Sequence, residues 1–162
     1  MIYVIIGQAG SGKTTFAKRH FLQGELQIVK DILPYTTNGK ICGIGKYGIG
    51  KRCEGTDTCS MSSQIDIIEQ VKKLTKEGKS VVVEGERILN KKFFEYLVLN
   101  KNHVMLIYLY CSVETSMRRL CNDEDSDISL HFLKSTITKS RNKFKEYRKF
   151  FITKIICTDK DD

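Results

Sequence analysis

Near its N-terminus the chain reads Gly7-Gln8-Ala9-Gly10-Ser11-Gly12-Lys13-Thr14, which matches the pattern G-x-x-x-x-G-K-[ST] at every fixed position. The stretch follows the apolar run 2–6, which predicts a strand, and precedes residues 16–22, which predict a helix. Glycines in such a turn let backbone N–H groups point inward around phosphate oxygens, and the positive end of the helix dipole adds to the attraction. The sequence therefore predicts a phosphate-binding loop (P-loop).

We expect this loop to bind ATP together with Mg²⁺. Lys13 is expected to reach the β- and γ-phosphates, and the Thr14 hydroxyl is expected to ligate the metal ion. Glu84 ends the apolar run 80–84, where a second acid commonly holds Mg²⁺ through water; an ion pair with Arg87 is the alternative. The residues expected to contact the nucleotide are Gly7, Ala9, Gly10, Ser11, Gly12, Lys13, Thr14 and Thr15.

Strand and helix patterns alternate through the rest of the chain. The alternation predicts an α/β fold of the P-loop NTPase type, with a five-stranded, mainly parallel sheet flanked by helices, in one domain over residues 1–162. A lid region is expected over about 118–145. The predicted strands are 2–6, 26–29, 80–84, 104–110 and 152–157, and the predicted helices include about 62–77, about 90–99, one from about 113 and one from about 130.

Residues 35–60, after the second predicted strand, are rich in glycine and have no hydrophobic periodicity. Long loops of this kind inside a domain are usually functional, so we expect a Gly/Lys-rich insertion that binds substrate. Basic side chains interleaved with aromatic ones suit a stacked base and a phosphate backbone. These side chains are Tyr35, Lys40, Lys46, Tyr47, Lys51 and Arg52.

The composition is that of a globular protein with excess positive charge. The 162 residues include 27 Lys and Arg against 19 Asp and Glu, a net charge of +8. This excess indicates an anionic partner, nucleotide or nucleic acid, or else a solvated basic surface. The apolar run 104–111 is shorter than the roughly 20 residues that span a bilayer, and the six cysteines form no C-x-x-C pair. We therefore expect a cytoplasmic protein without a zinc site or a disulfide framework.

Other classes of nucleotide-driven protein lack support in the sequence. GTPases carry N-K-x-D, whereas residues 90–93 read Asn-Lys-Lys-Phe and residues 142–145 read Asn-Lys-Phe-Lys. The L-S-G-G-Q signature of transport ATPases is also absent from the sequence. At this length, a small P-loop kinase is the remaining interpretation.

A kinase needs a base for its acceptor hydroxyl and cations for the transferred phosphoryl group. Asp31 follows the second predicted strand, and Asp57 lies at the end of the insertion; each is a candidate base, and each could instead cap a local turn. Arg118 and Arg119 lie where the lid is expected to begin. One of the two is expected to neutralise the phosphoryl group, and the other to be a surface or ion-pair residue.

Five segments carry a resemblance to a known family: the P-loop, Tyr35-Thr36-Thr37, Gly45-Lys46-Tyr47-Gly48, Gly55-Thr56-Asp57-x-x-Ser60 and Val83-Glu84-Gly85-x-Arg87. Together they resemble the small phage-encoded kinases that phosphorylate 5-hydroxymethyluracil already incorporated in DNA. The resemblance implies an ATP- and Mg²⁺-dependent kinase that modifies a DNA base in the host cytoplasm. Glu84-Gly85-Glu86-Arg87 also resembles the acid-Gly-x-x-Arg turn of nucleotide kinases, whose arginine contacts a phosphate or the acceptor. The expected substrate-binding residues are Tyr35, Lys46, Lys51, Arg52, Asp57, Arg87 and Arg141.

Three functions remain open at this point. The first is phosphorylation of the hydroxymethyl group in DNA, favoured by the basic insertion and by the basic row Lys134, Arg141 and Arg148. The second is a kinase for a free nucleoside, nucleotide or small metabolite, which needs no extended cationic surface. The third is a nucleotide-binding module without turnover, against which the intact Lys13 and Thr14 argue.

Overall fold

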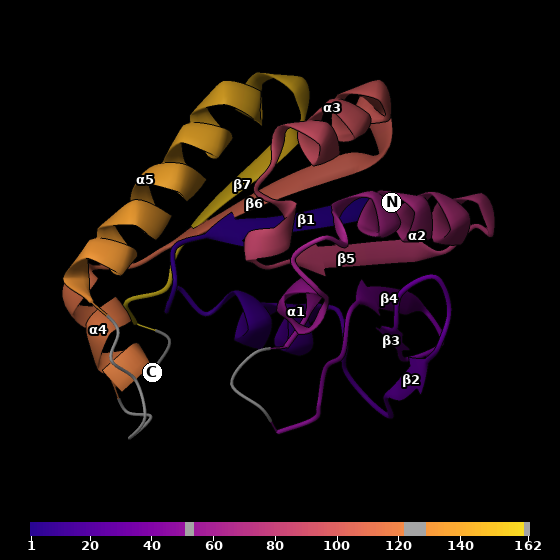
Figure 1. Ribbon diagram of the computed structural model, residues 1–162, viewed down its shortest axis with the longest axis horizontal. Helices are drawn as coiled ribbons and strands as arrows, with labels where there is room; N and C mark the ends of the chain where they lie inside the picture. Colours follow the sequence, from indigo (N-terminus) through magenta and orange to yellow (C-terminus); the bar gives the residue numbers. More distant parts are fainter. Residues whose placement is uncertain (51–53, 122–128, 161–162) are drawn as a thin grey trace.

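A seven-stranded sheet with the order β2-β3-β4-β5-β1-β6-β7 forms the centre of the computed structural model (Figure 1). The structure describes residues 1–50, 54–121 and 129–160. Five neighbouring strands are parallel, while β2 and β3, at one side of the sheet, pair antiparallel with their neighbours. The parallel strands are β4 (Ile41–Ile44), β5 (Ser80–Glu84), β1 (Ile2–Gly7), β6 (Val104–Tyr110) and β7 (Ile152–Cys157), and the two antiparallel strands are β2 (Gln27–Val29) and β3 (Tyr35–Thr37).

Helices cover both faces of the sheet, because the central strands are apolar on both sides. Val81 and Val83 of β5 face one side of the sheet and pack with α2, α3 and α5. Val82, between them, faces the other side and packs with Ala17 of α1. In Figure 1, α5 begins beside α4, at the end of the sheet where the loop after β1 lies, and runs back along β6 and β7. The helices are α1 (Lys13–His20), α2 (Gln64–Lys76), α3 (Lys91–Leu99), α4 (Val113–Cys121) and α5 (Leu130–Tyr147), with short 3₁₀ turns η1 (Thr56–Thr58), η2 (Glu86–Ile88), η3 (Lys101–His103) and η4 (Arg148–Phe150). None of the helices in the described ranges is long and apolar enough to cross a membrane.

The sheet has seven strands and not the predicted five, because the segment 35–60 is not one long loop. It contains β3, β4 and η1, and β4 pairs in parallel with β5. β4 was not predicted because Gly43 has a low strand propensity. A Cβ at this position would lie 2.8 Å from the Tyr47 ring. The glycine is therefore a packing requirement inside a strand and not a loop signal.

Tyr47 does not offer a stacking surface for a base, contrary to the expectation from the sequence. Its side chain is only 1% exposed and belongs to the core cluster between the sheet and α1. Tyr35, by contrast, is half-buried on β3 and packs against the opposite core cluster. The predicted lid region, 118–145, covers the end of α4 and most of α5, and residues 122–128 within it lie outside the described residues.

Candidate active site

The P-loop connects the end of β1 to the first residue of α1, at the carboxyl edge of the parallel strands. Gly10 and Gly12 have φ angles of 74° and 79°, in the left-handed region that suits glycine. A Cβ on Gly7 would lie 2.3 Å from the Leu109 carbonyl oxygen, so the fixed glycine lets β1 and β6 approach closely. The Lys13 ammonium donates a hydrogen bond of 2.9 Å to the Gln8 carbonyl and thus lies folded over the loop.

Residues from α4 and from the segments after β6 and β7 form hydrogen bonds with the P-loop and support it. The Gln8 amide nitrogen donates to the Cys111 carbonyl at 2.8 Å and to the Ser116 hydroxyl at 2.9 Å. Arg119 donates to the Gly10 carbonyl at 3.2 Å, and the Thr158 hydroxyl donates to the Ser11 carbonyl at 3.1 Å. The first two bonds anchor the Gln8 side chain of the loop, and the last two hold the Gly10 and Ser11 carbonyls, so together they fix the loop in a preorganised shape.

The two candidate lid arginines occupy different environments on α4. Arg119 is half-buried and also donates 2.6 Å and 3.2 Å hydrogen bonds to the carbonyl and hydroxyl of Thr158. Arg118 is exposed to solvent. In this structure, Arg119 therefore ties the P-loop to the residue that follows β7.

Glu84 lies at the end of β5 beside the first turn of α1. The Thr14 hydroxyl donates a 3.0 Å hydrogen bond to its Oε1, and the side chain is 1% exposed. Burial raises the pKa of Glu84 to about 7, while the charge of Lys13 acts in the opposite direction. The alternative partner, Arg87, instead donates its Nε to the Cys59 carbonyl at 3.4 Å.

The Thr14–Glu84 pair fits Mg²⁺ better than a metal held by protein alone. Within the described ranges, no three His, Cys, Asp or Glu side chains gather as a metal site. Mg²⁺ typically takes one or two protein oxygens and completes its shell with water and substrate phosphates. Thr14 and Glu84 are the residues that would hold the ion beside the P-loop.

The Tyr47 hydroxyl lies on the buried side of the Thr14–Glu84 pair. A Cβ on Gly55 would lie 2.2 Å from Glu84 Oε1 and 2.8 Å from the Tyr47 hydroxyl, so both groups converge on this glycine. Burial raises the pKa of Tyr47 well above its ordinary value, and the nearby Glu84 charge adds to the effect. The tyrosine is therefore a neutral neighbour of the carboxylate and belongs to the site through Glu84.

Asp57 is brought to the same place by η1. Its Oδ1 accepts a 2.9 Å hydrogen bond from the Glu86 backbone N–H, at the start of η2. The pKa of Asp57 is raised, mainly by burial, while that hydrogen bond and the positive charges of Lys13 and Arg87 lower it. A half-buried carboxylate under the influence of the P-loop lysine has the surroundings of a general base.

Asp31 is engaged elsewhere. Lys73 on α2 lies 2.7 Å from its carboxylate, and the Gln70 amide donates to the same group at 3.1 Å. These contacts hold the pKa of Asp31 below its ordinary value, which makes the group a weaker base. The structure therefore brings Asp57, and not Asp31, together with Lys13 and Glu84.

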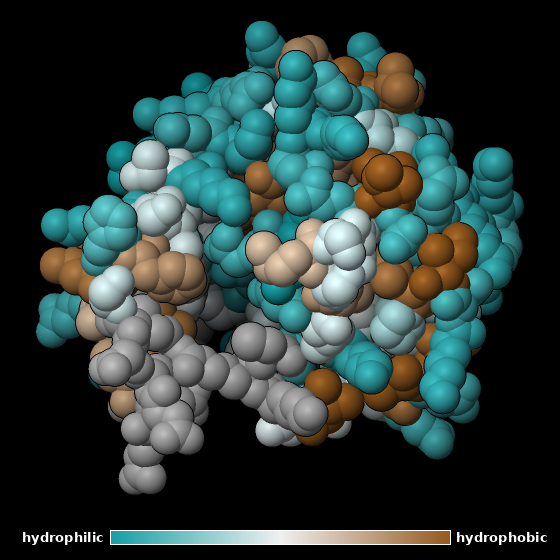
Figure 2. All heavy atoms as spheres, in the orientation of Figure 1, coloured by the Kyte–Doolittle hydropathy of each residue, from teal (hydrophilic) through white to brown (hydrophobic). Residues whose placement is uncertain are grey.

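The remaining predicted substrate residues are spread over the surface. Lys46 follows β4 and is exposed, and Arg87 is half-buried on η2 next to Asp57. Lys51 and Arg52 lie outside the described residues. Lys134 and Arg141 are exposed on α5, and Arg148 is exposed at the start of η4. Figure 2 shows that the surface over α5 is mainly hydrophilic.

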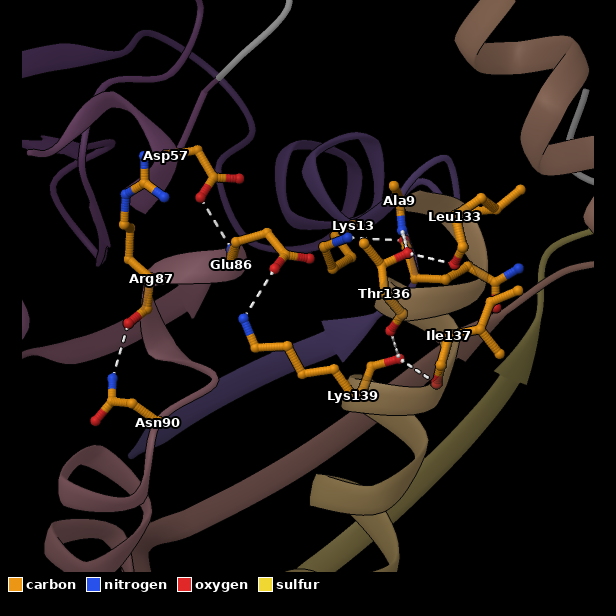
Figure 3. A network of polar contacts seen from close by, with 12 residues as sticks. Ala9, Lys13, Asp57, Glu86, Arg87, Asn90, Leu133, Thr136, Ile137 and Lys139 are labelled. Atoms are coloured by element: carbon orange, nitrogen blue, oxygen red, sulfur yellow. Dashed lines mark hydrogen bonds and ion pairs between the residues drawn. The ribbon is translucent and has the colours of Figure 1, made fainter. Parts of the chain in front are cut away.

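α5 contributes contacts that the sequence reasoning missed (Figure 3). The Thr136 hydroxyl accepts a 3.1 Å hydrogen bond from the Ala9 backbone N–H of the P-loop. One turn further along, the Lys139 ammonium lies 3.2 Å from Glu86 Oε2. Glu86 belongs to the Glu84-Gly85-Glu86-Arg87 turn, but no local pattern indicated a contact with Lys139, 53 residues later in the chain. α5 thus touches both the loop and the Asp57 side of the site.

Comparison with known proteins shows the fold but no family. No protein-family model matches the chain, and no curated protein matches it. An uncharacterized protein from Eubacterium ventriosum has 15% identity over 99% of this chain and 89% of its own, with a TM-score of 0.50. Deoxyadenosine kinase from M. mycoides with dCMP and a flexible dCDP bound has 14% identity over 96% and 90%, with a TM-score of 0.49. Its complex with dATP has 13% identity over 97% and 91%, with a TM-score of 0.47.

Proposed function

We propose that this protein is an ATP-dependent kinase that phosphorylates a hydroxyl group of a nucleoside or nucleotide. One observation carries the proposal: the Thr14 hydroxyl of the P-loop is hydrogen-bonded to the buried Glu84 at 3.0 Å. Asp57 is held just beyond the end of the same strand, where its Oδ1 accepts a 2.9 Å hydrogen bond from the Glu86 backbone N–H. A P-loop lysine, a magnesium pair and a separate carboxylate are the parts that phosphoryl transfer to an alcohol requires.

Each residue has a distinct part in this reaction. Lys13 leaves the Gln8 carbonyl and contacts the β- and γ-phosphates. Thr14 and Glu84 would hold Mg²⁺, which would neutralise charge on the phosphate oxygens when bound. Asp57 takes the acceptor proton on the oxygen that Glu86 does not hold, as the new P–O bond forms and the bond from the γ-phosphorus to ADP breaks.

The position of α5 favours a small acceptor. The helix contacts the P-loop through Thr136, and it contacts Glu86, next to Asp57, through Lys139. It therefore covers the region where the phosphoryl donor and the acceptor are expected to meet. A free nucleoside or nucleotide can enter beneath such a helix, whereas a base in a duplex has to leave the stack first.

The hydroxymethyl group of 5-hydroxymethyluracil in DNA is the second candidate acceptor. The exposed cations Lys46, Lys134 and Arg141 favour it, because phosphate backbones are bound through such side chains. In this case, binding falls as salt rises, by about 0.7–0.9 in log K per contact and unit of log salt.

One labelling experiment separates these functions. The protein is incubated with γ-labelled ATP, Mg²⁺ and, in parallel, a panel of nucleosides and nucleotides, unmodified DNA, and DNA containing 5-hydroxymethyluracil. We expect label on a free nucleoside or nucleotide. Label only on modified DNA would favour the second candidate. ATP binding without transfer to any acceptor would identify a non-catalytic module and contradict the proposal.

A further inference from the structure

The contacts of α5 are arranged across the path that a phosphoryl group would take. Thr136 accepts from the Ala9 N–H on the ATP side, and its hydroxyl donates in turn to the Leu133 carbonyl at 2.9 Å. Lys139, three residues further and therefore on the same side of the helix, reaches Glu86 on the acceptor side. In Figure 3, the side chains of Lys13, Glu86 and Lys139 converge between the P-loop and η2.

Glu86 is an incomplete partner for Lys139. Its Oε2 faces the ammonium at 3.2 Å, but its Oε1 is buried without a hydrogen-bond partner within the described ranges. A buried acceptor atom left in this way costs free energy, so a polar ligand that reaches it is favoured. The backbone N–H of the same residue, Glu86, donates a hydrogen bond to Asp57, so this acceptor atom lies close to the candidate base.

The ion pair is weak enough to exchange. The Lys139 side chain is 47% exposed and that of Glu86 is 27% exposed, and pairs at this exposure are screened by water. A terminal phosphate carries more negative charge than one carboxylate and offers several acceptor oxygens. An ATP molecule on the P-loop therefore competes well for the same ammonium.

We propose that Lys139 is a cation of the phosphoryl-transfer site, which Glu86 holds until the γ-phosphate of ATP replaces it. The inference rests on the proposed kinase function and adds a residue to it. Lys139 makes no covalent bond; it neutralises charge on the phosphoryl oxygens while the bonds to phosphorus exchange. Its departure also leaves the Glu86 carboxylate free to accept a hydrogen bond from the acceptor molecule.

The first test compares Lys139→Ala with Lys145→Ala, which removes an exposed lysine near the end of the same helix. We expect Lys139→Ala to weaken ATP binding about tenfold and to leave ADP binding unchanged, because only ATP carries the γ-phosphate. The transfer rate constant, kcat, is expected to fall about 10²-fold, the scale for one preorganised contact. Lys139→Arg restores most of both, and Lys145→Ala matches the wild type.

The second test uses Glu86→Gln, which keeps the shape of the side chain and removes its charge. We expect this variant to bind ATP a few-fold more tightly than the wild type, because Lys139 no longer has to leave a carboxylate. In a Lys139→Ala background the same substitution is expected to have no such effect. Equilibrium titration of ATP and ADP into the four proteins measures this coupling, which a purely structural contact would not produce.

The results separate this inference from the proposed function. If the wild type transfers phosphate but Lys139→Ala keeps its ATP-over-ADP preference and its kcat, the role of Lys139 is overturned and the kinase function stands. If the wild type binds ATP without transfer, the kinase function is overturned. The contact of Lys139 with the γ-phosphate then stands if Lys139→Ala loses the ATP-over-ADP preference, and it is overturned if the variant keeps that preference. If the wild type binds neither nucleotide, both proposals are overturned.

Discussion

The Thr14 hydroxyl donates a hydrogen bond to Glu84 across 3.0 Å, which joins the first helix of the chain to the end of a strand 70 residues later. The carboxylate in this bond is removed from water, so its charge is costly unless a cation is near. Lys13 is near enough to lower the Glu84 pKa, but burial outweighs that effect. The pair is therefore suited to receive a divalent cation.

Replacement of Lys13 tests the P-loop assignment. We expect Lys13→Ala to reduce kcat by about 10²–10⁴, because a preorganised charge on the phosphates is lost. The side chain is half-buried and, within the described ranges, its hydrogen bond goes to a loop carbonyl, so the thermal unfolding midpoint should stay close to that of the wild type. Steady-state kinetics and thermal unfolding measure the two effects, and a variant with full activity would contradict the assignment.

A matched pair of substitutions tests which carboxylate is the base. We expect Asp57→Asn to lower kcat by about 10²–10⁴ while ATP affinity is preserved, because a general base acts on the acceptor. Asp31→Asn removes a partner of Lys73 on the surface of α2 and should leave kcat unchanged. A larger kinetic loss in Asp31→Asn than in Asp57→Asn would reverse the assignment.

The raised pKa of Glu84 predicts a pH dependence of stability. Its pKa is about 7 in the folded protein against an ordinary value of 4.5, so between these two pH values the folded state holds a proton that the unfolded chain has released. The free energy of unfolding without Mg²⁺ should therefore decrease as pH rises through this range and level off above it.

Glu84→Gln should remove this dependence. Relative to the wild type, the variant is expected to gain on the order of 3 kcal/mol in free energy of unfolding between pH 4.5 and pH 8. Urea denaturation of both proteins at several pH values measures the difference. Parallel pH profiles of the two proteins would mean that Glu84 ionises normally.

Gly85 is expected to be essential for the position of Asp57. Its φ is 119°, and a Cβ there would lie 2.5 Å from the Thr56 hydroxyl and 2.9 Å from Asp57 Oδ1. Gly78, with φ of 76° and open space around a Cβ, provides the control for backbone strain alone. We expect Gly78→Ala to cost about 1–2 kcal/mol of stability without affecting kcat. Gly85→Ala should cost more and also lower kcat, as measured by urea denaturation and kinetics; equal effects of the two would contradict this.

The P-loop and the central strands could be predicted from sequence because their signals are local. The motif 7–14 fixes its own position between a strand and a helix, and Val81, Val82 and Val83 form the continuous apolar run of a buried strand. Glu84 could be placed for the same reason, since the end of its strand marks the edge where ligands of this architecture bind.

The other features depend on contacts between distant segments. β4 has a glycine where a strand former is expected, because Tyr47 packs over it, and this packing is visible only in three dimensions. The choice between Asp31 and Asp57 depends on which one Lys73 of α2 reaches. Lys139 had no local signal at all, because its partner Glu86 lies 53 residues earlier in the chain.

The bonds that hold the P-loop from behind have a consequence for biosynthesis. Ser11 is bonded to Thr158, which is made 147 residues later, and Arg119 links Thr158 to Gly10. A nascent chain that has emerged only as far as β6 contains the complete glycine-lysine motif but lacks this support. Tight nucleotide capture should therefore begin only after β7 has left the ribosome and joined the sheet, so ATP would stabilise the finished molecule and not its early fragments.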